Sequence, residues 1–312
     1  MPAPVRVRPR PPRSEPPAMK ARTTRLARVE TAVREVYAYC PPTLTSFADN
    51  GRAAYEQMWK RFMFDLGVGP FGGHTVLDVG CGSCEKAAFY HDWGARVTAI
   101  DMTPSILDLG RQIVGTRDIR LIHGSIFEFS SEERFDIVIA DGVLHHTADT
   151  AAALRRCATF VNDGGLLVFG LVNIWGSFWW FKLARAITRI LGGSDFHRRA
   201  LWGQRLFGWT RGTHEHVAAS SWFFRSPESW AYDWFGNPRW NAHTPGEVGR
   251  WLDELGFEHV GSIPSIVQKP HGNAASLLTA IAGDGPDLMG LAWLFTGQPN
   301  MFYVCARKSR AE

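Results

Sequence analysis

The feature that most constrains this chain is a short apolar strand that runs into a glycine loop, with a second strand ending in an acid downstream. Residues 75–82 read T-V-L-D-V-G-C-G, and the strand predicted over 96–100 ends in Asp101, nineteen positions after Gly82. Gly80 and Gly82 carry no side chain, so the backbone there can approach a ligand closely. Asp101 is placed to accept two hydrogen bonds from a ribose diol. This layout is typical of an α/β domain that binds a nucleoside.

The composition of the loop separates two classes of nucleoside ligand. A dinucleotide fingerprint needs a third glycine, and Glu85 occupies that position. A carboxylate at this place repels a diphosphate, whereas S-adenosylmethionine has no phosphate and carries a cationic sulfonium. Asp78, at the end of the first strand, can face the amino group of that cofactor. The acidic loop therefore favours the methyl donor.

At these residues the chain resembles the class I S-adenosylmethionine-dependent methyltransferases, specifically the type 11 small-molecule group related to ubiquinone-biosynthesis enzymes. The resemblance runs from about residue 76 to residue 172 and rests on five ordered motifs, at 76–83, 101–107, 123–126, 135–146 and 164–169. It implies the following cofactor-binding residues: Asp78, Gly80, Cys81, Gly82, Asp101, Met102, Ser125, Ile126, Asp141 and Gly142.

Two positions depart from the family pattern. Cys84 stands where the family often has a third loop glycine, and Ser125 stands where it often has an acid. The second departure leaves open which group holds the adenine.

Strands alternate with helices along the rest of the chain, which predicts an α/β fold with a doubly wound, mostly parallel, Rossmann-like sheet. Seven strands are expected, at 75–79, 96–100, 119–123, 135–140, 165–171, 257–263 and 301–306. Helices are expected at 84–93, 104–115 and 149–161, with another capped by Thr244. The resemblance implies that the last strand is antiparallel. Ligands of such sheets bind beyond the carboxyl ends of the strands, where Asp78, Asp101, Ser125 and Asp141 all fall.

The composition of the chain predicts its domain boundaries and the kind of partner that it binds. Residues 1–45 are predicted to be a disordered tail and linker, Pro- and Arg-rich at the start, and 46–312 to be the methyltransferase domain. The net charge of +4 is too small to predict nucleic-acid binding, so a small-molecule substrate is expected and no nucleic acid. Five cysteines show no disulfide pattern, and no apolar segment resembles a signal peptide, so a cytoplasmic protein is expected.

An aromatic-rich helical insertion over 173–242, between the fifth and sixth strands, is predicted to cap the substrate side. It holds nine of the thirteen tryptophans in the chain. These large aromatic side chains either line a pocket for a bulky apolar substrate or form a small core of their own, and both can hold. The residues singled out as substrate-binding are Tyr55 and Trp59 on a helix over 48–66, together with Tyr232 and Arg239.

Two further segments carry expectations about partners. A helix over 178–191 places Lys182, Arg185 and Arg189 on one face, a pattern of either a peripheral membrane contact or an ordinary surface helix. The apolar segment 277–295 is expected to cap the site or to form a homodimer contact.

Histidines are the candidates for a catalytic base. His145 and His146 follow the fourth strand, and the resemblance implies that this turn borders the transferred methyl group. His146 is the first candidate and His243 an alternative, although a helix cap or a cofactor contact explains these histidines equally well. No metal site is expected, because Cys81 and Cys84 lack a second pair and His214 and His216 lack a third ligand.

The sequence therefore predicts methyl transfer from S-adenosylmethionine to an oxygen, carbon or nitrogen atom of a bulky, largely apolar small molecule. Secondary metabolites, quinones or isoprenoids, and lipid-linked sugars all fit. Two alternatives stay open: an RNA or protein methyltransferase that docks through the basic tail, and a non-catalytic protein that binds an adenosyl ligand.

Overall fold

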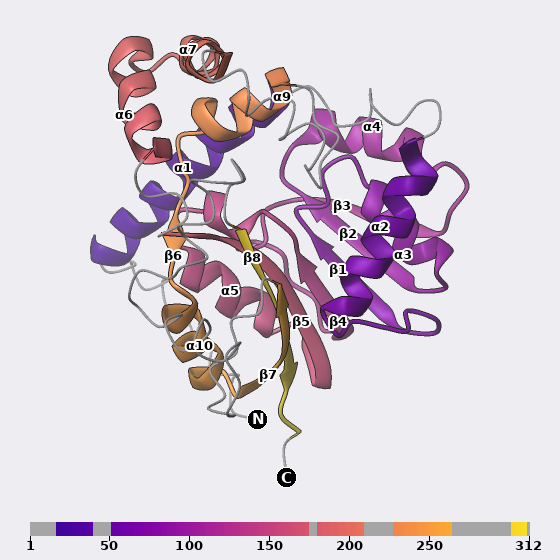
Figure 1. Ribbon diagram of the computed structural model, residues 1–312. Helices are drawn as coiled ribbons and strands as arrows, with labels where there is room; N and C mark the ends of the chain where they lie inside the picture. Colours follow the sequence, from indigo (N-terminus) through magenta and orange to yellow (C-terminus); the bar gives the residue numbers. More distant parts are fainter. Residues whose placement is uncertain (1–16, 40–50, 175–179, 209–226, 264–300, 311–312) are drawn as a thin grey trace, which may run out of the picture.

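The computed structural model describes residues 17–39, 51–174, 180–208, 227–263 and 301–310 (Figure 1). Its strands are β1 (Thr75–Val79), β2 (Arg96–Asp101), β3 (Ile119–His123), β4 (Phe135–Ala140), β5 (Val161–Asn173), β6 (Ala242–His243), β7 (Phe257–Ile263) and β8 (Met301–Lys308). Its longer helices are α1 (Pro17–Tyr39), α2 (Gly51–Asp65), α3 (Glu85–Asp92), α4 (Pro104–Val114), α5 (Thr150–Ala158), α6 (Trp180–Gly192), α7 (Phe196–Gly208) and α10 (Pro245–Glu254). Shorter helical segments are η2 (Leu144–His146), α9 (Pro227–Ala231) and η3 (Tyr232–Gly236).

The strands form one mixed sheet in the order β3-β2-β1-β4-β5-β8-β7. The pairs among β1 to β5 are parallel, and β8 runs antiparallel to both β5 and β7. The expected seven strands and the antiparallel last strand are confirmed. The structure adds the two-residue strand β6, which pairs with the end of β5.

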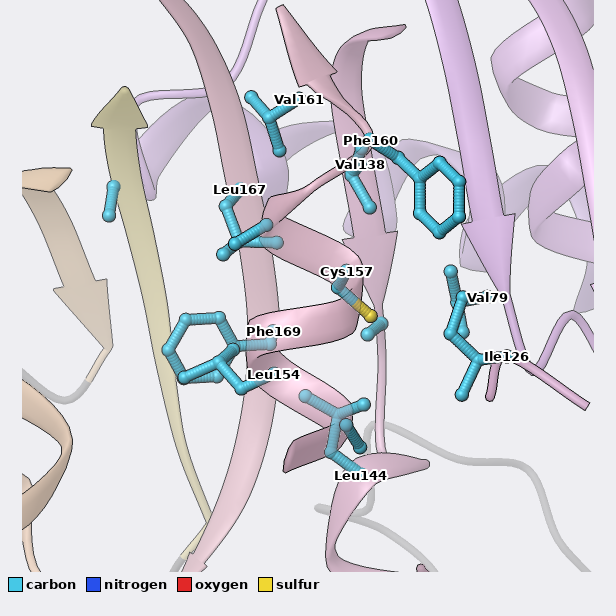
Figure 2. Close-up of a cluster of buried hydrophobic side chains, with 14 of the residues drawn as sticks. Val79, Ile126, Val138, Leu144, Leu154, Cys157, Phe160, Val161, Leu167 and Phe169 are labelled. Atoms are coloured by element: carbon cyan, nitrogen blue, oxygen red, sulfur yellow. The ribbon is translucent and has the colours of Figure 1, made fainter. Parts of the chain in front are cut away.

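Helices cover both faces of the sheet, which is why the central strands are apolar along nearly their whole length. Figure 1 shows α2, α3 and α4 on one face and α5 and α10 on the other. Between the sheet and α5, the side chains of Leu154, Cys157 and Phe169 pack in one continuous core (Figure 2). On the opposite face, α2 and α3 contribute Trp59, Met63 and other buried side chains to a second core.

The amino-terminal segment corrects one expectation. Residues 17–39, expected to belong to a disordered tail, form helix α1. Apolar side chains recur there at helical spacing, and Val33 and Val36 are each only 1% exposed. Burial of this one face repays the entropy of ordering the helix, which the Arg-rich composition conceals. Residues 1–16 and 40–45 of the expected tail lie outside the described residues.

Helix α6 corrects a second expectation, because its apolar and basic faces lie differently from the pattern predicted. Arg185 is 7% exposed and points inward, whereas Leu183 and Ile190 are 53% and 81% exposed. Lys182 and Arg189 are exposed as expected. Among the described helices, none combines the length and the apolar character needed to cross a membrane.

Candidate functional site

The glycine loop after β1 has the backbone that a close-approaching ligand requires. Gly80 and Gly82 both have positive φ, at 69° and 53°. A Cβ atom at Gly80 would overlap Val143, whereas one at Gly82 would meet nothing within 4 Å. The loop thus packs closely against Val143 at Gly80 and leaves open space at Gly82. Cys81, another predicted cofactor residue, pairs its thiol with Cys84, 3.5 Å away.

The Asp101 carboxylate is held in place by backbone donors. Its Oδ2 accepts a 3.0 Å hydrogen bond from Gly82 N, and its Oδ1 accepts a 2.8 Å bond from Thr103 N. Burial raises the pKa of Asp101, and these two N–H groups act against that rise. The carboxylate keeps further lone pairs for a ribose diol.

Four acidic residues and one lysine lie near one another at the glycine loop: Asp78, Glu85, Asp101, Asp141 and Lys86. Asp78 is buried, and burial raises its pKa to about 7, with Lys86 opposing and Asp101 and Glu85 adding to the rise. Lys86 forms an ion pair with Asp141, and its ammonium lies 4.0 Å from the centre of the Trp59 ring. The sequence analysis did not single out Lys86, because an ordinary helix-surface lysine has the same sequence context.

These acids fit a cationic ligand. Among the residues that the structure describes, Glu85 Oε1 and Asp141 Oδ1 find no hydrogen-bond partner, although both atoms are buried. A sulfonium and an ammonium group would satisfy such a site, and a diphosphate would not. Gly142, next to Asp141, also has positive φ, at 70°.

Beyond β3 the site reaches helix α1. Ser125 and Ile126 are both largely buried. The Ser125 hydroxyl accepts a 3.2 Å bond from Phe127 N and donates to Glu30 on α1. The backbone carbonyl of Met102 lies 3.2 Å from His123 Nε2. Glu30 is therefore an unanticipated acid beside Ser125, the position where this chain lacks the acid that the family pattern often has.

His146, in the short helix η2 after β4, is the best-connected of the three candidate bases. Its side chain is 4% exposed, and Nε2 lies 3.3 Å from Asp233 Oδ1. Nδ1 lies 3.0 Å from the Arg239 carbonyl and 3.0 Å from Asn237 Nδ2. Because Nδ1 faces an acceptor and a donor, either tautomer keeps a partner there. Nε2 can therefore hold or release a proton.

His145 is buried in a different environment. Burial first, and then the neighbouring His146, hold the pKa of His145 well below its usual range. Its Nδ1 has no hydrogen-bond partner within the described ranges of the chain, while its backbone carbonyl accepts a 2.8 Å bond from Asn241 N. A neutral, buried imidazole of this kind packs the turn and does not accept a proton near neutral pH.

His243 lies on β6, where its Nδ1 is 2.9 Å from Glu247 Oε2 in the first turn of α10. Its Nε2 is buried, and no described residue forms a hydrogen bond with it. Thr244 caps α10 by accepting a 3.1 Å bond from Glu247 N, as expected.

Asp233 is held in place by two buried arginines that contact the turn carrying it. Asp233 lies in η3, a single π-helical turn, and such turns are frequent at functional sites. Arg185 donates to the carbonyls of Trp234 and Asn237, and Arg199 donates to that of Gly236 at 2.7 Å. These bonds satisfy carbonyl groups that a helix end leaves unpaired. Arg185 of α6 and Arg199 of α7 thus stabilise the turn that carries Asp233.

The four predicted substrate residues are dispersed. The Tyr232 hydroxyl lies 2.7 Å from His197 Nδ1, and Arg239 contacts His146 through its backbone carbonyl. Tyr55 and Trp59 are buried in the second core, where Trp59 Nε1 donates to the Tyr90 hydroxyl at 3.1 Å.

Residues that the sequence analysis missed are Glu30, Tyr37, Lys86, Asp233 as a partner of His146, and Asn237. Only the helical spacing of Leu26, Val29, Val33 and Val36 signals that Glu30 and Tyr37 belong to an ordered element. Within the described part of the chain, no three His, Cys, Asp or Glu side chains are grouped to hold a metal ion. His214 and His216 lie outside it.

Comparison with known proteins agrees with this geometry. Residues 77–169 match the family model described as a methyltransferase domain. The chain is 34% identical over 110 residues to a ubiquinone biosynthesis O-methyltransferase of Alkalilimnicola ehrlichii, covering 34% of this chain and 44% of that protein. It is 29% identical over 146 residues to the protein of the same name from Serratia proteamaculans, covering 45% of this chain and 61% of that protein. The chain thus spans about half the length of these relatives.

A solved structure described as PKMT2 from Rickettsia typhi shares the fold, with a TM-score of 0.54 at 14% identity over 89% of this chain and 55% of that one. The sheet order, the acidic glycine loop and the family match together show that this chain carries a class I S-adenosylmethionine-dependent methyltransferase domain, with S-adenosylmethionine as its cofactor.

Proposed function

We propose that this protein transfers the methyl group of S-adenosylmethionine to a hydroxyl oxygen of a bulky, largely apolar small molecule. The observation that carries the proposal is the buried pair of His146 and Asp233, 3.3 Å apart. His146 follows β4, whose neighbour β1 carries the glycine loop, and Asp233 comes from η3. When bound, the cofactor supplies a methyl group on a positively charged sulfur.

In this proposal His146 Nε2 accepts the proton of the acceptor hydroxyl, and the Asp233 carboxylate stabilises the resulting imidazolium. The Arg239 carbonyl accepts from Nδ1–H in that charged state. A base placed in this way contributes a factor of about 10² to 10⁴ in rate. The depressed pKa of His145 supports His146 over its neighbour as the base.

The apolar character of the acceptor is supported by the cap. Trp234 and Phe235 pack with Ala184, and Trp240 packs against them. Part of the tryptophan content thus forms a small core next to the proposed base. The two relatives above are named as O-methyltransferases of ubiquinone biosynthesis, which supports an oxygen acceptor.

We also propose that α6 lies on a membrane surface. Leu183 and Ile190 form one exposed stripe, and Lys182 and Arg189 form the adjacent basic one. An apolar stripe beside basic residues suits an anionic lipid surface, where an apolar acceptor would partition.

Transfer of a labelled methyl group to an alkyl-substituted catechol tests the proposed function. The wild-type chain should turn over, His146→Gln should lose about 10²-fold or more in kcat, and Asp101→Ala should lose cofactor binding. His259→Gln, at an exposed histidine of the edge strand β7, is the matched control and should retain activity. Binding of S-adenosylhomocysteine without transfer to phenolic, amine or carbon acceptors would favour the non-catalytic alternative.

Removal of residues 2–16 separates the small-molecule proposal from RNA or protein methylation that docks through the basic tail. The deletion has to end there, because α1 begins at Pro17 and contributes contacts to the site. Unchanged turnover of the catechol supports the proposal. Loss of activity on RNA or peptide substrates only would support the alternative.

A further inference from the structure

A carboxylate of α1 lies at the edge of the site where no strand supplies one. Glu30 accepts a hydrogen bond from the Ser125 hydroxyl, across 95 positions of sequence. Ser125 follows the end of β3, and β3 pairs with β2 so that His123 lies beside Asp101. Glu30 therefore lies near the end of β3. The neighbouring strand β2 carries Asp101, the residue proposed to bind the ribose.

The sheet order fixes the direction in which the cofactor must extend. The glycine loop belongs to β1, Asp101 to β2 and Ser125 to β3, and these strands are adjacent in that order. Neighbouring strands lie about 4.8 Å apart. A ligand with its amino-acid end over β1 and its ribose on Asp101 thus places its base over the end of β3, beside Ser125 and Glu30.

The hydrogen bonds around Ser125 determine which group can recognise that base. The hydroxyl accepts from Phe127 N and donates its only proton to Glu30. The carboxylate of Glu30 is acceptor-only and has several lone pairs, so it remains the stronger acceptor for an amine. The exocyclic amine of adenine is a two-proton donor.

From this geometry we infer that Glu30 accepts a hydrogen bond from the exocyclic amine of the cofactor's adenine, and that α1 thereby selects adenine over a 6-oxo purine. The inference rests on the cofactor assignment and is independent of the acceptor proposed above. A 6-oxo purine presents an oxygen at this place, which the carboxylate repels.

The surroundings of Glu30 hold it in position for this role. Val33 and Val36 anchor α1, and α1 packs against α4. Burial raises the pKa of Glu30 and the bond from Ser125 lowers it, with Arg34 also lowering it and Glu128 raising it. The carboxylate thus sits on a fixed helix face and is partly removed from water.

Calorimetric titration with S-adenosylhomocysteine and its inosine analogue, S-inosylhomocysteine, tests the inference. The wild-type chain should bind the adenosine ligand roughly 10- to 100-fold more tightly, the range expected for a hydrogen bond to a charged group. Glu30→Ala should weaken the adenosine ligand by up to about the same factor and should not weaken the inosine ligand, because it removes a repulsive carboxylate. Glu35→Ala, at an exposed acid of the same helix, is the control.

A second variant keeps the test sharp if Glu30→Ala loosens the helix. Ser125→Asp in the Glu30→Ala background returns a carboxylate to the same edge and should restore most of the discrimination. Equal weakening of both ligands, or discrimination retained in Glu30→Ala, would overturn the inference while leaving the methyltransferase proposal intact. A wild-type chain that binds neither ligand would overturn the cofactor assignment and this inference with it.

Discussion

The Tyr37 hydroxyl donates a 2.6 Å hydrogen bond to Asp233 Oδ1, joining two residues 196 positions apart. The same oxygen lies 3.3 Å from His146 Nε2. The Tyr37 ring also meets the His146 ring edge-on, with centroids 5.7 Å apart. Helix α1 therefore supports the proposed base through two contacts, and two turns earlier it carries Glu30.

Tyr37→Phe should lower kcat by roughly 3- to 10-fold with little change in KM, because the ring packing stays and one neutral donor to Asp233 is lost. Steady-state kinetics measure kcat and KM separately. Tyr39→Phe, at a tyrosine of the same helix that is largely exposed, is the control and should leave kcat unchanged. An unaltered kcat in Tyr37→Phe would show that Tyr37 only packs.

The placement of the candidate cofactor-binding residues at the central strands could be predicted from the sequence, because it depends on local residue order. Asp78, Gly82 and Asp101 belong to short runs whose residue order sets both the backbone and the side chain, and the structure brings them together as expected. The partners of the proposed base are not local. Tyr37, Asp233 and His146 come from three separate elements, and no spacing along the chain records their meeting.

The two corrected segments show the limit of composition as a guide. Arg185 looked like part of a solvated basic face, yet the carbonyl groups of Trp234 in η3 and of Asn237 just after it accept its hydrogen bonds in the interior. Helical periodicity places a residue on a face, and only the packing of neighbouring elements determines which face is buried. For α1, likewise, composition alone did not show that one face of the helix is buried, so the segment was expected to be disordered.

Cofactor affinity should fall as pH drops below about 7, with Asp78 as the group responsible. Burial raises the pKa of Asp78 to about 7 in the folded chain, so the carboxylate is ionised above that pH and protonated below it. A cationic ligand favours the ionised form, and the Kd for S-adenosylmethionine should rise up to about tenfold per pH unit below 7. Calorimetry at pH 5.5 to 8.5 measures the slope. Asp78→Asn should bind weakly at every pH, and Asp108→Asn, at an exposed acid, should retain the slope.

The stability of the fold should carry a separate pH signature from His145. The pKa of His145 is depressed in the folded chain, so near pH 6 the unfolded chain binds a proton that the folded chain does not. Stability therefore rises with pH up to the unfolded pKa of about 6.5 and is lost below it, by at most about 1.4 kcal/mol per pH unit. Asp78, with its folded pKa raised to about 7, contributes a slope of the opposite sign in both chains, so the His145 contribution is the difference between them. Urea unfolding between pH 5 and 8 should show a stability that rises less steeply with pH in His145→Gln than in the wild type. Equal slopes would place the protonated group elsewhere.

Ile190→Glu should abolish binding to anionic vesicles and leave methyl transfer to a water-soluble catechol unchanged. Ile190 is 81% exposed beside Leu183 on α6, so the substitution removes apolar contact with lipid and does not disturb a core. Burial of such a side chain contributes about 1.5 to 3 kcal/mol, which corresponds to a loss of roughly 10- to 100-fold in partitioning.

Co-sedimentation with phosphatidylserine-containing and purely phosphatidylcholine vesicles measures the effect. The double variant Lys182→Gln/Arg189→Gln should weaken only the preference for anionic vesicles, because each basic residue near the surface contributes about 1 kcal/mol. Phe64→Glu places the same charge on an exposed aromatic of α2, on another part of the surface, and should bind vesicles like the wild type. Vesicle binding that survives Ile190→Glu but is lost in Phe64→Glu would move the membrane contact from α6 to α2.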